Sequence, residues 1–139
     1  MKNDLHTQFI TFCDYSMMSQ ENKLSIIGIF DEVRVQEFPG GLASAALVAI
    51  IQGKPNTSYK LTAKGMKGKT EVFPPLELNI ITGITGASNI TINLKNISFP
   101  EEGIYEFFIL NGTKEIGKTI LKIIQVQPEN QGIKYKLPN

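Results

Sequence analysis

Short runs of β-branched and aromatic residues, separated by clusters of glycine, proline and asparagine, constrain the fold of this chain more than any other sequence feature. Many of these runs alternate apolar with polar residues, as strands with one buried face do. Tyr59, Leu61 and Ala63, for example, alternate with polar residues. The pattern predicts strands over residues 9–15, 24–30, 33–38, 46–52, 59–64, 70–73, 76–81, 88–97, 104–110 and 115–126.

Turn signals join several of these predicted strands. Asn111-Gly112 is a strong hairpin signal because both residues tolerate positive φ. Residues 16–23 form a polar loop that would close a hairpin between the first two strands, and Pro39-Gly40-Gly41 ends the third. Pro74-Pro75 excludes one continuous central strand, because proline cannot donate a hydrogen bond to a sheet.

Residues 42–52 fit either of two secondary structures. Their alanines favour a helix, whereas Val48, Ile50 and Ile51 favour a strand, which we assign to 46–52. With no long amphipathic helix in the sequence, antiparallel strands joined by short turns must bury one sheet face against another. The expected fold is an all-β, immunoglobulin-like antiparallel β-sandwich of about seven to nine strands, and a small β-barrel is the alternative.

Length, charge and cysteine content limit the classes of function. The 139 residues, 42% of them hydrophobic, suit one domain, which we expect over residues 1–127 with 128–139 as a frayed tail. A net charge of +1 gives no reason to expect a nucleic-acid or membrane partner. Cys13 is the only cysteine, and the first residues lack the apolar stretch of a signal peptide, so we expect a cytoplasmic protein.

Three segments carry a family resemblance: F-C-D-Y at residues 12–15, L-S-I-I-G-I-F-D at 24–31 and F-P-E-E-G-I-Y-E-F at 99–107. The chain resembles a family of small, single-domain bacterial β-sandwich proteins of unknown function. The resemblance implies the fold and a bacterial source, and it supplies no catalytic residues. In the third segment, Tyr105 is placed to bond nearby backbone as a tyrosine corner does.

The segment from Gly112 to Thr119 matches the P-loop pattern G-x-x-x-x-G-K-[ST]. A P-loop needs a helix after it, so that the helix N-terminus meets the phosphates. Residues 120–126 are strand-forming instead, and few residues remain for the rest of a nucleotide-binding domain. We therefore interpret Asn111-Gly112 as a hairpin turn and Gly117 as a bulge.

Other catalytic and metal arrangements lack partners in the sequence. His6 is the only histidine and precedes the first predicted strand, and a lone cysteine such as Cys13 is usually a small buried hydrophobe. Pairing of the first two strands would bring His6 near Asp31 and Glu32, where a weak cation site is conceivable. We expect no catalytic residue, no cofactor and no metal.

Two groups of residues suit contact with a partner. Met17 and Met18 lie side by side in the expected loop, where flexible apolar side chains adapt to a partner. Lys60, Lys64, Lys67 and Lys69 form the one local basic group, which either binds a phosphate backbone or simply solvates a strand.

The sequence therefore favours a non-catalytic cytoplasmic module that binds a protein partner or copies of itself. Two alternatives remain: a nucleotide-binding protein or enzyme using Gly112 to Thr119, and a weak nucleic-acid binder using Lys60 to Lys69.

Overall fold

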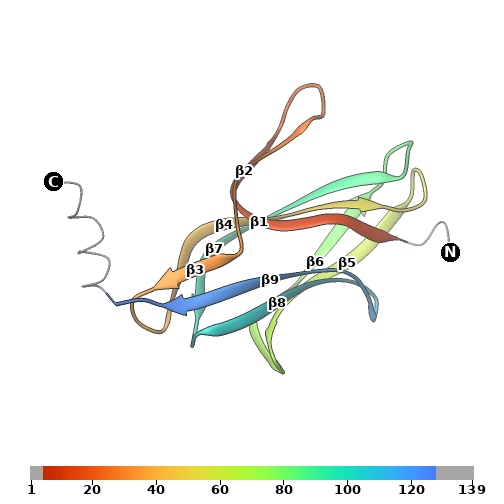
Figure 1. Cartoon of the computed structure of the whole chain (residues 1–139). Helices are drawn as coiled ribbons and strands as arrows, with labels where there is room; N and C mark the ends of the chain where they lie inside the picture. Colours follow the sequence, from red (N-terminus) through yellow and green to blue (C-terminus); the bar gives the residue numbers. More distant parts are fainter. Residues whose placement is uncertain (1–4, 128–139) are drawn as a thin grey trace.

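The computed structural model describes residues 5–127, which form nine strands in two facing sheets (Figure 1). The first sheet has the order β2-β1-β4-β7 and the second the order β3-β9-β8-β5-β6. The strands are β1 (His6–Met18), β2 (Leu24–Phe30), β3 (Glu32–Val35), β4 (Gly40–Gln52), β5 (Ser58–Lys67), β6 (Thr70–Ile81), β7 (Ala87–Phe99), β8 (Gly103–Asn111) and β9 (Lys114–Gln125). The expected β-sandwich of seven to nine strands is thus confirmed, and the expected tail, 128–139, lies outside the described residues.

The expectation of purely antiparallel pairing is wrong at one edge. The chain leaves the first sheet after Phe30 and enters the second at Glu32, where β3 pairs with β9 in parallel. β3 also ends at Val35, three residues before the predicted end. The alternation of residues within a strand does not show whether its neighbour runs parallel or antiparallel. For β3 this depends on which strand of the second sheet the chain reaches after it leaves the first sheet.

The core lies between the two sheets and follows the alternation seen in the sequence. Ile90, Ile92 and Leu94 of β7 are buried, as expected. The ring centroids of Phe12 and Phe107 are 4.7 Å apart, and those of Phe99 and Tyr105 are 4.9 Å apart, both edge to face. Such pairs add specific geometry to apolar burial, so these rings tie the two sheets together.

Tyr105 forms the expected tyrosine corner. The residue is fully buried, and its hydroxyl donates a hydrogen bond of 2.6 Å to the carbonyl oxygen of Glu101. The bond fixes the turn between β7 and β8, because it satisfies a buried hydroxyl and a turn carbonyl together.

The β8–β9 hairpin is confirmed, with a small change in its turn. Asn111 and Lys114 are opposed as the last strand residues, so the central turn residues are Gly112 and Thr113. Gly112 has φ of 65°, as a type II′ turn requires of its first central residue. The register shifts between Ile109 and Leu110, beside the position expected to bulge.

Two strand boundaries differ from the sequence expectation. β6 is one continuous strand through Pro74-Pro75, which proline allows because β6 is an edge strand and its pairing with β5 is irregular there. β4 is a strand, as assigned, but it begins at Gly40 rather than at 46. Pairing with β7 over its whole length holds this alanine-rich segment extended and overrides its helix propensity.

Candidate binding surface

The first hairpin leaves the sandwich partway along β1. β1 pairs with β4 from His6 to Cys13, which lies opposite Ala46, and beyond Cys13 it pairs with β2 alone. Figure 1 shows this hairpin rising away from the two sheets. We call residues 14–29 the arm.

A bend at Gly28 lets the arm turn away from the sheet. Gly28 has φ of 72°, a conformation that residues with a Cβ rarely adopt. A Cβ at this position would also collide with the carboxylate of Asp14 on the opposite strand. Glycine at position 28 is therefore needed both for the backbone angle and for the close approach of Asp14.

The inner side of the arm packs on the outside of the first sheet. Leu24 and Ile26 cover a small second cluster made of Cys13, Ala46 and Val48. The hydroxyls of Ser16 and Thr91 lie 3.2 Å apart and link the arm to β7. Cys13 is a small buried apolar residue in this cluster, as expected, and burial raises the pKa of its thiol.

The outer side of the arm exposes large apolar side chains. Tyr15 and Ile27 lie directly opposite each other on the two strands, so they share one face. Of the ten exposed large hydrophobic residues described, five lie on the arm: Tyr15 (54% exposed), Met17 (48%), Met18 (47%), Ile27 (53%) and Ile29 (60%). Met18 lies opposite Leu24 and therefore faces the inner side of the arm, so we call the other four, Tyr15, Met17, Ile27 and Ile29, the arm patch. Exposed apolar side chains that share one face are candidates for contact with a partner.

Met17 and Met18 do not lie in a loop, which corrects the sequence expectation. Both are the last residues of β1, opposite Ser25 and Leu24 of β2. The turn itself is short and is held by Ser19, whose hydroxyl accepts hydrogen bonds from the backbone amides of Glu21 and Lys23. Met17 and Met18 therefore lie on a hydrogen-bonded pair of strands rather than on a loop.

A groove opens at the base of the arm, where β1 departs from the sheet. β4 continues from Ala45 back to Gly40 without β1 beside it, while it still pairs with β7 on its other side. The groove has a volume of about 390 Å³, and Asp14, Ile29 and Leu42 are among the residues that line it. Since Ile29 belongs to both, the groove and the arm patch form one continuous surface.

The lysines expected as a basic group are mostly paired with acids. Lys60 lies 3.7 Å from Glu77, Lys64 lies 3.9 Å from Glu71 and Lys67 lies 3.2 Å from Glu101. Lys69 is exposed in the turn between β5 and β6. Carboxylates interspersed among the lysines offset the positive potential that would attract a phosphate backbone.

The P-loop-like segment has no phosphate-binding geometry. Its residues lie in the β8–β9 turn and on β9, which continues as a strand to Gln125. Lys118 donates a hydrogen bond of 3.2 Å to the carboxylate of Glu106. Gly117 has a structural reason to be glycine, because a Cβ there would collide with Thr7 of β1.

The structure separates His6 from the two acids expected near it. His6 lies opposite Gln52, whereas Asp31 follows Phe30, which pairs with Phe12. The six residue steps along β1 from His6 to Phe12 span roughly 20 Å. Glu32 instead accepts a hydrogen bond of 2.7 Å from Arg34, and within residues 5–127 no group of three or more potential ligands can hold a metal ion.

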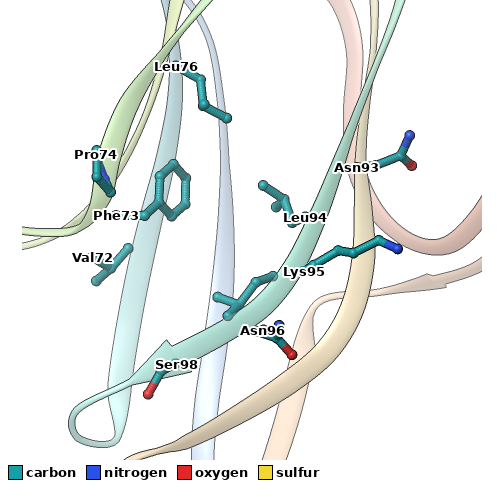
Figure 2. A pocket seen from close by; sticks show the side chains of 10 residues that line it. Val72, Phe73, Pro74, Leu76, Asn93, Leu94, Lys95, Asn96 and Ser98 are labelled. Atoms are coloured by element: carbon teal, nitrogen blue, oxygen red, sulfur yellow. The ribbon is translucent and has the colours of Figure 1, made fainter.

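The structure reveals a second concave surface that the sequence did not suggest. It lies between the edge strands β6 and β7, has a volume of about 420 Å³, and its floor includes Phe73, Leu94 and Ile97. Figure 2 shows Phe73 and Leu76 on one side and Leu94 on the other, with Asn93 and Lys95 directed away from Phe73. Two edge strands that do not pair leave such a gap, and local sequence pattern carries no sign of it.

Comparisons with known proteins establish a family and a fold. A family model described as "Family of unknown function (DUF6941)" matches residues 8–124. No curated protein matches the chain. Within residues 5–127, no helix is long and apolar enough to cross a membrane.

Several solved structures resemble this fold. A β-glucosidase from Listeria innocua in complex with isofagomine has a TM-score of 0.52 and 8% identity, and the match covers 89% of this chain but 16% of that one. A GH3 β-glucosidase from Bifidobacterium adolescentis has a TM-score of 0.50 and 10% identity, covering 86% of this chain and 17% of that one. An immunoglobulin-like protein from Pseudomonas aeruginosa has a TM-score of 0.46 and 12% identity, and the match covers 86% of this chain and 96% of that one. At these identities the likeness to the β-glucosidases shows the fold alone, and this chain spans about one sixth of their length.

Proposed function

The chain belongs to the Family of unknown function (DUF6941), and we propose that it is a non-catalytic binding module that contacts another polypeptide through the arm patch. The observation that supports this function is the concentration of exposed apolar side chains on the arm. A two-stranded segment that leaves its sheet exposes apolar surface to water at a cost in free energy, unless a partner covers it. Tyrosine, methionine and isoleucine supply the kind of contact area found at the centre of protein interfaces.

The chemical character of the arm patch favours a polypeptide over a small molecule. The arm patch belongs to a hairpin that rises from the two sheets (Figure 1), whereas small-molecule sites are concave and enclose most of their ligand. The arm also offers open strand edges, to which an extended segment of another chain can add by backbone hydrogen bonds. We propose that the binding takes place in the cytoplasm, in keeping with the expectation from the sequence.

Site-specific photo-cross-linking tests this function. A photoreactive phenylalanine analogue is placed at Tyr15, and in a matched control at Lys122, which is exposed on β9 in the second sheet. Irradiation in cytoplasmic extract of the source cell should give a discrete adduct from position 15 and none from position 122. Equal labelling from both positions, or no adduct from position 15, would contradict the proposal.

A paired variant sharpens the same experiment. Met17→Ser with Met18→Ser removes apolar area from the arm without touching the core, since both side chains are about half exposed. The position 15 adduct should then decrease strongly while the unfolding midpoint stays nearly unchanged. An adduct of undiminished yield would show that the cross-linked contact does not depend on the arm patch.

A further inference from the structure

β2 is the least protected of the edge strands in the described structure. The sheets end at β2, β7, β3 and β6. β6 carries Pro74-Pro75, β3 has only four residues with a charge on two of them, and β7 carries Lys95. β2, with the sequence L-S-I-I-G-I-F, has neither charge nor proline. Charge, proline, short length and bends are the devices that keep sheet edges from pairing. β2 has only the bend at Gly28, so it is the edge most open to another strand.

We propose that β2 pairs antiparallel with β2 of a second copy of this chain, about a two-fold axis that passes between the two Ile27 residues. This inference rests on the proposed function, because it names the partner of the arm. In this register Leu24 lies opposite Phe30 of the second copy, and Ser25 lies opposite Ile29 of the second copy. The pairing is isologous, so it closes after two chains rather than growing into a fibre.

Charge at the two ends of β2 favours this partner and this register. Lys23 immediately precedes the strand and Asp31 immediately follows it. Antiparallel pairing about Ile27 places Lys23 opposite Asp31 of the second copy, and the symmetry repeats this contact at the other end. Moving the register by one residue in one direction removes both contacts, and moving it in the other places Lys23 opposite Glu32, which already accepts a hydrogen bond from Arg34 within its own chain. Lys23 lies 3.4 Å from Glu21 within the chain, but both side chains are almost fully exposed, so that ion pair constrains the lysine little.

The apolar surface of the arm is also self-complementary in this arrangement. Residues opposite each other in a sheet share a face, and the two-fold axis keeps the outward face outward. Tyr15 and Ile27 of one copy then continue into Ile27 and Tyr15 of the second copy as one band across four strands. The middle of β2 has no charge of either sign, so the pairing brings no like charges together.

Sedimentation of the full chain with charge-reversal variants tests this pairing. The unmodified chain should form a dimer in the micromolar range. Lys23→Asp alone and Asp31→Lys alone should each weaken the dimer about tenfold, because each creates two like-charge contacts. Mixing the two single variants should restore a dimer of one chain of each kind, identified by native mass spectrometry, because both contacts are then between opposite charges.

A second variant tests the strand contact itself. Ile27→Lys places two lysines opposite each other at the axis and should weaken the dimer by more than about a hundredfold. Ile84→Lys, at a loop residue that is 82% exposed, is the matched control and should leave the dimer intact. Circular dichroism checks that both variants keep the fold.

Three results would overturn the pairing: an unmodified chain that remains monomeric at high concentration, a dimer that survives Ile27→Lys, or single charge variants that do not combine preferentially. A monomeric chain whose position 15 still cross-links to a different protein would refute this inference while leaving the proposed function standing. Loss of that cross-link as well would refute both.

Discussion

The β8–β9 hairpin and the β1–β2 hairpin differ in what lies on either side of them. β8 and β9 each have strand neighbours on both sides, and the inward residues of β8, Tyr105, Phe107 and Ile109, are buried. The two strands of the arm have only each other, and their outward residues are about half exposed. The β8–β9 hairpin therefore buries its apolar side chains in the core, while the arm leaves apolar side chains exposed to solvent.

Truncation of the central ring of β8 should have the largest effect. Phe107 is buried against Phe12 and Phe73, so Phe107→Ala should lower the free energy of unfolding by about 3–5 kcal/mol. Tyr15→Ala in the arm should lower it by less than about 0.5 kcal/mol. Urea unfolding monitored by circular dichroism measures both, and similar losses would remove the distinction between the hairpins.

Removal of a single hydroxyl group from Tyr105 in β8 or from Tyr15 in the arm compares the two hairpins in the same way. Tyr105→Phe leaves the carbonyl of Glu101 without its 2.6 Å hydrogen bond and should cost about 1–3 kcal/mol. Tyr15→Phe changes an exposed residue, and its unfolding midpoint should not move measurably. If Tyr105→Phe were equally silent, the corner would not be a stabilising feature.

A comparison of Gly28 with Gly68 separates the effect of the backbone angle from the effect of the close approach of Asp14. Gly28 has φ of 72° and Asp14 close by, whereas Gly68 has φ of 60° and nothing within 4 Å of the point where a Cβ would lie. Gly68→Ala should cost about 1 kcal/mol through backbone strain alone, and Gly28→Ala about 2 kcal/mol. Removing the carboxylate as well, in Asp14→Ala with Gly28→Ala, should recover the difference. Equal losses in the two single variants would contradict this account of the bend.

The smallest expected effect is a change of stability with pH that depends on Cys13, which is buried beneath the inner side of the arm. Burial raises the pKa of its thiol, so the folded chain keeps a proton that the unfolded chain releases above about pH 8.5. Stability should therefore be full below that pH and decrease as pH rises above it, and Cys13→Ala should lack this decrease. Parallel pH profiles of the two proteins in urea unfolding would mean that the arm does not keep the thiol from solvent.

Features that depend on neighbouring residues in the sequence could be predicted. The position of the β8–β9 hairpin, the alternation of β7 and the Tyr105 corner all follow from conformational preferences within a few residues. The burial of Cys13 also follows, because a lone cysteine is usually a small buried hydrophobe.

Features that depend on which strands become neighbours could not be predicted. β6 continues through Pro74-Pro75 because it is an edge strand, and His6 lies opposite Gln52 because β1 pairs with β4. The arm exists because β1 leaves β4 after Cys13, so the local pattern assigns Met17 and Met18 to a loop. The sequence singled out only these two methionines among the exposed residues of the arm, because Tyr15, Ile27 and Ile29 have the pattern of ordinary strand residues.

Amide hydrogen exchange of the full chain, followed by mass spectrometry in dilute and in concentrated solution, tests the central claim most directly. If the arm is the contact surface and a second copy covers it, exchange in β2 should slow on concentration while exchange in β8 stays the same, because β8 already has both neighbours. Exchange in β2 that does not change, or that changes equally in both strands, would contradict the account.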